Sequence, residues 1–396
     1  MHDFMTKLLP RSVPRSAVAV ILILTLAAAV AFAAVSHLVA RFKLNQQARG
    51  RRLYTRALAD MDSNRTLAIE EFRAALTCDP NNSQYQLSLG RALRDTGQLD
   101  EAESYLQSLW QRSPEDGTIN LALARVAARR GSLDDATRYY HNAMYGVWNS
   151  DADSNRRKAR IELIEFLLQK SVFDHARSEL VALVTFLPSD PALHLQAAQL
   201  STQAHDYSGA LAEYEKVLHL DRSTQDRTAS AALAGAGETA YRSGNYRTAQ
   251  RYLQLALKSN PQDFNLRDLT ASTDLILATD PFIRRISDVE RNHRIISSFT
   301  SAGDRLRACA QQKGVSLAPA NAQSLQASPL VQLHDRWLAA RRDLPRLRSL
   351  GETDLPDAIM DVVFAIEQQT ALDCGEPQGI DKALLLISRD REAVDQ

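Results

Sequence analysis

The sequence has few of the residues that mark a disulfide-rich, metal-binding or nucleic-acid-binding protein. Its 396 residues include three cysteines, Cys78, Cys309 and Cys374. These are too few for a disulfide scaffold and too widely spaced for a zinc site. Lys plus Arg and Asp plus Glu both total 47, so no net charge attracts nucleic acid. We therefore expect no metal, no cofactor and no nucleic-acid partner.

Glycine, proline and aromatic residues are also scarce, with 15 Gly, 13 Pro and 6% aromatic side chains. Good helix formers (Ala, Leu, Arg, Gln and Glu) are abundant instead, which predicts an all-α protein. The chain carries no His-Glu-x-x-His pair and no nucleophile elbow, and the segment around Gly235 and Gly237 lacks the Lys-Ser/Thr of a phosphate-binding loop. These absences favour a protein that is not an enzyme.

One long apolar run lies near the N-terminus, from Ala17 to Val35, with Thr25 as its only polar residue. As a helix it would rise about 28 Å, close to the thickness of the hydrocarbon core of a bilayer. We expect a basic tail over residues 1–15 and a transmembrane anchor over residues 16–40. A soluble core helix would need a polar face, which this run does not have.

Two questions about this run stay open at the level of sequence. Ala31-Phe32-Ala33 fits the cleavage site of a signal peptide, although the run is longer than the usual signal core. The balance of basic residues favours a cytoplasmic C-terminal side, yet long domains translocate largely regardless of such charges. Three basic residues precede the run and six follow it: Lys7, Arg11 and Arg15, then Arg41, Lys43, Arg49, Arg51, Arg52 and Arg56.

One sequence frame recurs along the next part of the chain. The stretch "GQLDEAESYLQSLWQRSP" at 97–114 shares its Gly, Ala, Leu and Pro positions with "GNYRTAQRYLQLALKSNP" at 244–261. Its alanine, Ala102, recurs at one fixed spacing, as Ala68 before it and as Ala136 after it. Three further copies follow if two polar insertions are allowed between copies. Their alanines are Ala176, Ala210 and Ala249. The frame therefore occurs six times over residues 49–263.

A period of about 34 residues with two amphipathic helices per unit resembles the tetratricopeptide repeat family. The resemblance implies an α-solenoid in which the two helices of a unit cross where bulk is absent, as at Gly90 with Ala102. No unit buries its apolar face alone, so neighbouring units must stack. The crossing positions are Gly90, Ala102, Ala124, Ala136, Ala176, Ala198, Ala210, Gly237 and Ala249.

The resemblance also implies a concave groove that is lined by the first helix of each unit and binds a peptide. In the second and third copies the groove positions include two leucines and four arginines. We predict that these arginines converge on an acidic peptide or a carboxylate terminus, because a guanidinium binds a carboxylate through two hydrogen bonds. The alternative is a solvated helix face that is partly paired with Asp95. The groove residues are Leu87, Arg91, Arg94, Leu121, Arg125 and Arg129.

The chaperone-binding members of the family hold a peptide C-terminus with a clamp of Lys and Asn residues. That clamp is not matched in this sequence. The ligand of those members therefore does not carry over to this chain.

The remainder of the chain predicts further helices. We expect a capping helix over residues 264–280 and a small helical domain over residues 281–396, which resembles no family and contains a mobile linker at residues 315–329. Within this domain, an apolar stripe from Phe282 predicts one long helix that ends near Gly314.

The same domain contains two of the three cysteines. We predict that Cys309 and Cys374 pair as a disulfide; the alternative is two separate buried thiols. The closed loop would stabilise a small domain that a linker interrupts. Because such bonds persist mainly outside the cytoplasm, the pairing favours a periplasmic location for the C-terminal bulk.

Taken together, these features predict a bacterial, membrane-anchored adaptor that holds protein or peptide partners near the membrane. One alternative is an enzyme whose catalytic part is the C-terminal helical domain, with the repeats as a substrate arm. Another is a structural scaffold that associates with copies of itself.

Overall fold

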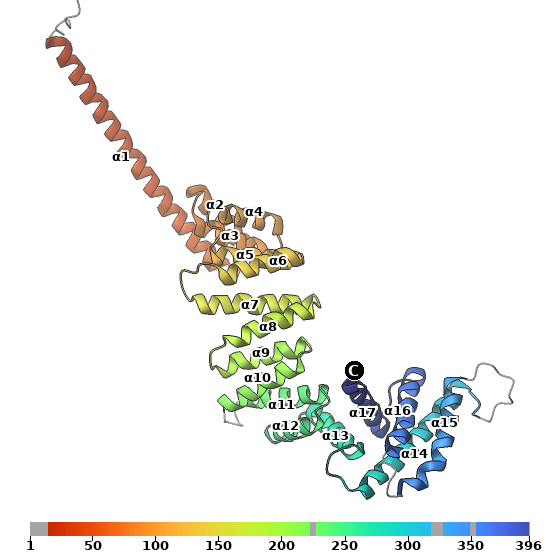
Figure 1. Cartoon of the computed structure of the whole chain (residues 1–396). Helices are drawn as coiled ribbons and strands as arrows, with labels where there is room; N and C mark the ends of the chain where they lie inside the picture. The colour runs from red at the N-terminus through yellow and green to blue at the C-terminus, as the bar shows by residue number, and fades with distance from the viewer. Residues whose placement is uncertain (1–14, 222–226, 318–327, 349–353, 396) are drawn as a thin grey trace, which may run out of the picture. The chain divides into compact units, whose positions relative to one another are not determined.

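The computed structural model describes residues 15–221, 227–317, 328–348 and 354–395, and over these residues the chain is built from helices without strands (Figure 1). The predicted all-α fold is therefore confirmed. Contacts within the chain divide it into two compact units, Met1–Phe166 and Leu167–Gln396. Each unit is described by itself.

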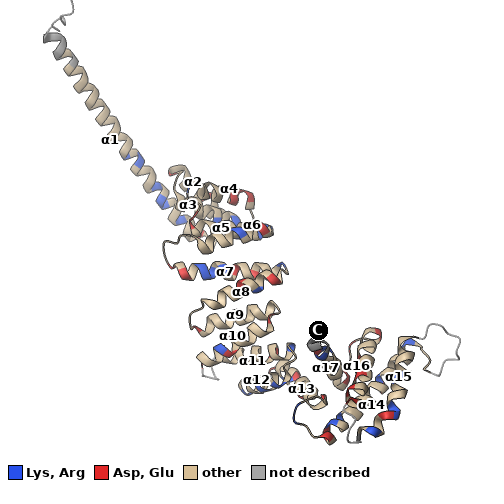
Figure 2. Ribbon diagram, viewed as in Figure 1, with Lys and Arg blue, Asp and Glu red and all other residues tan. Residues whose placement is uncertain are grey.

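The first unit begins with one unbroken helix of 46 residues, α1 (Arg15–Asp60). Beyond its grey N-terminal end, α1 has its first charged residues only toward its C-terminal half (Figure 2). There the helix packs on α2 (Arg65–Cys78), and both Gly50 and Ala57 are buried. The apolar run and the first helix of the repeats thus belong to one helix, whereas the sequence pattern predicted an anchor at residues 16–40 and a separate repeat helix.

The rest of the first unit consists of helix pairs that begin and end as the repeat frame predicts. Asn64, Asn82 and Asp116 each accept a backbone N–H bond at the start of a helix. Gly97 and Gly131 have φ values of 83° and 78°, the left-handed conformation that lets the chain turn between paired helices. The helices are α3 (Ser83–Asp95), α4 (Leu99–Trp110), α5 (Gly117–Arg130), α6 (Leu133–Tyr145) and α7 (Ala152–Gln169), which crosses the boundary between the units.

The second unit continues the helix pairs and ends in a cluster of longer helices. The repeat helices are α8 (Phe173–Thr185), α9 (Pro191–Gln203), α10 (Tyr207–Leu220), α11 (Arg227–Arg242) and α12 (Tyr246–Ser259), of which α9 pairs with α10 and α11 with α12. The remaining helices are α13 (Phe264–Thr279), α14 (Asp288–Lys313), α15 (Pro329–Asp343), the 3₁₀ helix η1 (Leu344–Arg348), α16 (Leu355–Cys374) and α17 (Gly379–Asp395).

The crossing positions of the frame lie where paired helices touch. A side chain on Gly90 would lie 2.9 Å from Leu106 Cγ, and one on Gly237 would lie 2.8 Å from Leu253 Cγ. Each glycine therefore accommodates a leucine of the paired helix. The seven alanines have no exposed surface: Ala102, Ala124, Ala136, Ala176, Ala198, Ala210 and Ala249.

The start of the predicted long helix is wrong. Helix α14 begins at Asp288, where the Ser287 side chain accepts the N–H of Glu290, and not at Phe282. The Asp280 carboxylate instead accepts the N–H of Phe282 at 2.8 Å, and Arg285 has a φ of 70°, so the chain turns before the helix starts. The predicted end is correct, because Gly314 terminates α14 with a φ of 67°. Most of the predicted linker, 318–327, lies outside the described residues.

The C-terminal helices share one apolar core with the last helix of the repeat array. Phe299 of α14 stacks on Trp337 of α15 with 5.0 Å between ring centres. Ile276 of α13 belongs to the same cluster of buried side chains, as do Val363 of α16 and Leu384 of α17. The capping helix therefore joins the array to the C-terminal helices through side-chain packing.

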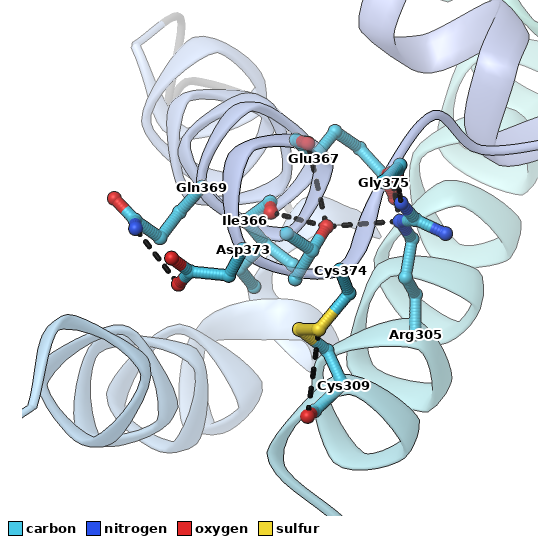
Figure 3. The surroundings of a disulfide bond; sticks show 9 residues. Arg305, Cys309, Ile366, Glu367, Gln369, Asp373, Cys374 and Gly375 are labelled. Carbon is cyan, nitrogen blue, oxygen red and sulfur yellow. Dashed lines mark hydrogen bonds and ion pairs between the residues drawn. A yellow bond between two sulfur atoms is a disulfide. The ribbon is translucent and has the colours of Figure 1, made fainter. Parts of the chain in front are cut away.

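A disulfide joins α14 to α16 in this cluster (Figure 3). The Cα atoms of Cys309 and Cys374 lie 5.8 Å apart, within the range that a disulfide spans. Cys374 is the last residue of α16 rather than part of the following turn. One helical turn before Cys309, Arg305 donates to the Thr370 hydroxyl and to the Gly375 carbonyl at 2.9 and 2.8 Å. Two neighbouring links thus hold the ends of these helices together.

Candidate functional site

The predicted groove arginines lie on two helices of the first unit. Arg91 and Arg94 belong to α3, and Arg125 and Arg129 belong to α5. Arg91 and Arg125 occupy equivalent places in adjacent repeats. Of the two leucines, Leu121 is buried and Leu87 is half-buried.

Three of the four arginines already have partners, which corrects the prediction that all four converge on one ligand. Arg125 binds the Glu162 carboxylate of α7 through two hydrogen bonds of 2.7 Å each. This bond and the nearby negative charge raise the pKa of Arg125 against the opposing effect of burial. Arg94 donates from Nε and Nη2 to its neighbour Asp95, at 2.8 and 2.7 Å. Arg129 donates to the backbone carbonyl of Arg94 at 2.9 Å.

Arg91 differs from the other three. It forms no hydrogen bond or ion pair with any residue in the described part of the chain, and its Nε is buried without a partner. Burial lowers the pKa of Arg91, and repulsion by Arg125 and then Arg94 lowers it further. A cation held in this way is unfavourable until an anion joins it.

A pocket of about 340 Å³ opens beside Arg91 and Arg125. One wall comes from α5 and contains Thr118 and Leu121, whereas the opposite wall comes from a loop and from the start of α7. This second wall supplies an aromatic ring, several polar groups and a third cation. The residues of the second wall are Trp148, Asn149, Ser150, Asn155 and Lys158.

The loop wall is positioned by backbone pairing. Gly117 N–H donates to the Val147 carbonyl and Val147 N–H donates to the Glu115 carbonyl, both at 2.8 Å. The Trp148 indole then lies over Gly117, where a side chain would clash with the ring, and its Nε1 donates to the Ala143 carbonyl at 2.9 Å. The residues that interrupt the regular repeat spacing after the third copy therefore build part of the pocket.

Sequence reasoning missed Trp148 and Lys158. Trp148 stands where four of the five other copies have proline, so it breaks the pattern but gives no sign of its place in space. The polar stretch from Ser150 to Asn155 lengthens the repeat spacing in the sequence, but α7 starts within it at Ala152 and places Lys158 in the pocket wall.

The C-terminal cluster contains an unusual buried acid, Glu367. Its side chain has no exposed surface, and its only charged partner among the described residues is Arg305, with 3.3 Å between Nε and Oε2. Burial first and Asp381 second raise the pKa of Glu367 to about 8. This carboxyl group lies inside the packed C-terminal cluster and has no access to solvent. Among the described residues, no group of His, Cys, Asp and Glu is arranged to hold a metal ion.

Comparison with known families identifies the helix pairs of the first unit. Two models of the family described as tetratricopeptide repeat match residues 54–116 and residues 93–145. Bacteriophage adsorption protein A of Escherichia coli (strain K12) is 39% identical over 75 residues, which are 18% of this chain. The match spans 7% of the length of that protein.

Solved structures of repeat proteins are also similar to this chain. The type IV pilus biogenesis factor PilW is 16% identical with a TM-score of 0.40, over 56% of this chain and 97% of that one. The C-terminal part of a TPR repeat-containing protein from Cytophaga hutchinsonii is 16% identical with a TM-score of 0.46, over 60% of this chain and 94% of that one. YrrB, described as a TPR protein with an unusual peptide-binding site, is 15% identical with a TM-score of 0.38, over 50% and 97%.

Proposed function

We propose that this chain, whose residues 54–145 match models of the tetratricopeptide repeat family, is an adaptor that holds partner proteins at a membrane. The observation that carries this proposal is the composition of α1. One continuous helix combines a candidate membrane span with the first helix of the repeat array. A partner bound to the repeats would therefore be held at a short distance from the bilayer.

The exposure of the apolar residues in α1 supports the membrane part of the proposal. Every large apolar side chain described between Leu22 and Leu44 is exposed, including Phe32 at 75%. The described residues of the first unit offer no surface that covers them. A helix that is apolar all round and uncovered by protein is stable in lipid, so the span is retained as an anchor in this proposal.

The disulfide supports a periplasmic location for the part of the chain that follows the span. Cys309 and Cys374 are paired in the structure, and such bonds persist in the periplasm and rarely in the cytoplasm. We place the repeats and the C-terminal helices in the periplasm of a bacterium. The basic residues that follow the span argue for the opposite orientation, but they do not prevent a long domain from being translocated.

Partner binding is assigned to the concave side of the first unit. The pocket beside Arg91 and Arg125 carries more cationic than anionic side chains, so it suits an extended or helical segment that is acidic or ends in a carboxylate. Leu121 offers the apolar contact that such a segment also needs.

Two measurements on native membranes test this proposal. The full chain should resist carbonate extraction, and N-terminal sequencing of the mature protein should begin near Met1. Crosslinking followed by purification from those membranes should recover a defined partner protein. Release by carbonate together with a mature N-terminus at Ala34 would contradict the anchor, and the absence of any crosslinked partner would contradict the adaptor.

A further inference from the structure

We infer that the pocket closed by the loop at residues 146–151 binds a single carboxylate of the partner between Arg91 and Lys158, with the apolar atoms beside that carboxylate against Trp148. This inference rests on the proposed function, because it assumes a protein partner in the groove of the first unit. It adds the chemical group that is recognised and the residues that recognise it. We call this arrangement the carboxylate socket, formed by Arg91, Thr118, Leu121, Trp148, Asn155 and Lys158.

The charges of the pocket leave room for one anionic group. Three cations line it, and the Glu162 carboxylate already neutralises Arg125 through two hydrogen bonds. Arg91 and Lys158 remain, and neither forms an ion pair with any residue in the ranges that the structure describes. They come from different helices, α3 and α7, so a ligand between them would be held from two sides.

The surroundings of Arg91 are unfavourable for its positive charge when no ligand is bound. Its side chain is half-buried, its Nε is buried without a hydrogen-bond partner, and two further guanidinium groups repel it. A structural arginine in such a place would normally have a carboxylate beside it, as Arg125 has Glu162. The missing anion is the group that we assign to the ligand, because a carboxylate would satisfy the guanidinium and offset the repulsion.

The remaining wall of the socket explains why the ligand is a peptide carboxylate rather than a free small anion. Trp148 and Leu121 present apolar surface inside the pocket, and Thr118 and Asn155 present hydrogen-bonding groups. A volume of about 340 Å³ exceeds what one carboxylate needs and accommodates the methylene groups or the adjoining residue that carry it. Aromatic and apolar contacts of this kind give binding energy beyond the charge interaction.

The carboxylate socket is formed at one place in the repeat array, where the loop at residues 146–151 interrupts the repeat spacing. Its outer wall is the segment that interrupts the repeat spacing, and that wall depends on Trp148 resting over Gly117. The same carboxylate chemistry could come from a Glu or Asp side chain or from the C-terminus of a partner chain. The experiment separates these two sources.

The test uses the full-length protein in lipid nanodiscs and fluorescein-labelled peptides of equal length and apolar content, measured by fluorescence anisotropy at low ionic strength. The first peptide has an internal Glu between leucines and an amidated C-terminus. The second has Gln in place of Glu and a free C-terminal carboxylate. The third has Gln and an amidated C-terminus, and the fourth has phosphoserine and an amidated C-terminus. We expect the first or the second peptide to bind and the third not to bind.

Variants then assign the binding to the socket. Arg91→Gln and Lys158→Gln should each weaken the carboxylate peptide at least about tenfold, because each removes one charge-assisted contact. Lys216→Gln removes an equal charge from the exposed face of α10 and should leave the affinity unchanged. Raising the salt concentration should weaken binding to the wild-type protein and have a smaller effect on each socket variant, which keeps one of the two cations.

Three results would overturn the carboxylate socket: equal binding of the third peptide, unchanged binding by both socket variants, or binding of the phosphoserine peptide alone. The proposed function is judged separately, by crosslinking in native membranes. If wild type and Arg91→Gln capture the same partner equally well, the socket is wrong while the adaptor stands. If the wild-type protein captures no partner, the adaptor itself is wrong.

Discussion

The indole ring of Trp148 lies directly over the α-carbon of Gly117, where no larger residue fits. Gly117 is the first residue of α5, which carries Arg125, whereas Trp148 belongs to the loop that precedes α7. This contact joins the third repeat to the outer wall of the carboxylate socket. The pocket consequently depends on a glycine that lies in a different helix from Arg91 and is distant from it in the sequence.

Replacing Gly117 with alanine tests this relationship. The added methyl group would overlap the ring of Trp148, so the indole must move away and the loop wall of the socket with it. We expect Gly117→Ala to lower the free energy of unfolding by about 1 to 3 kcal/mol and to weaken the carboxylate peptide. Thermal unfolding by far-UV circular dichroism and the anisotropy titration measure the two effects. Wild-type behaviour in both would show that Trp148 does not shape the pocket.

Arg91→Met separates a binding role from a structural one. The substitution removes a half-buried cation that has no partner among the described residues, and it relieves repulsion with Arg125. We expect stability to stay the same or rise by up to about 1 kcal/mol while peptide binding is lost. Arg125→Met is the matched comparison, since it leaves Glu162 without its partner and should destabilise the first unit. A clear loss of stability in Arg91→Met would identify Arg91 as structural.

Glu367 makes the stability of the C-terminal cluster depend on pH. Burial raises its pKa from the ordinary 4.5 to about 8, so the folded protein keeps a proton that the unfolded chain loses. The stabilisation is complete below about pH 4.5 and is lost as pH rises toward 8. Glu367→Gln should abolish much of this loss, which amounts to about 2 kcal/mol or more. Hydrogen exchange of the α16 amides at pH 5 and pH 8.5, corrected for intrinsic rates, measures it. Equal pH dependence in both proteins would contradict the assignment.

The disulfide predicts a thiol count. Under denaturing conditions without reductant, we expect the full chain to show one reactive thiol, that of Cys78, and three after reduction. Replacing Cys309 and Cys374 together with serine should destabilise the C-terminal cluster by about 4 kcal/mol in the chain-entropy account, because the closed loop spans 65 residues. Three reactive thiols in protein isolated from native membranes under alkylating conditions would remove the support for a periplasmic location.

The crossing alanines predict a further stability effect. Ala102 has no exposed surface and lies where α4 meets α3, so a larger side chain must push the helices apart. Ala102→Leu should lower the free energy of unfolding by about 1 to 3 kcal/mol. The same substitution at the exposed Ala212 of α10 serves as the control and should have little effect. An unchanged melting temperature in Ala102→Leu would mean that the repeat register is wrong.

The sequence was sufficient for the features that repeat. Gly97 and Gly131 turn the chain between paired helices, and each turn depends on one residue and its immediate neighbours. His205, at the equivalent place in a later copy, adopts the same left-handed conformation, with a φ of 57°. A periodic pattern therefore predicts local conformation and helix crossing well, since both recur with the same spacing.

The candidate site could be predicted only in part. The pattern placed Arg91 and Arg125 on adjacent helices, but it could not reveal that Glu162, 37 residues after Arg125, neutralises one of them. The place of Trp148 depends on backbone pairing between two loops, which has no signature in the side chains. Similarly, α14 starts later than predicted because the backbone turns at Arg285, and a pattern of apolar residues does not predict such a turn.

Site-specific photocrosslinking in native membranes tests the central claim most directly. A photoreactive phenylalanine derivative is placed at Leu87, one helical turn before Arg91 on α3, and in a second strain at Lys216, on the exposed face of α10. The account predicts a discrete crosslinked partner from position 87 that mass spectrometry identifies, that Arg91→Gln diminishes, and that position 216 does not yield. Adducts that form only from position 216, or equally from both positions, would contradict an adaptor that binds its partner through the groove of the first unit.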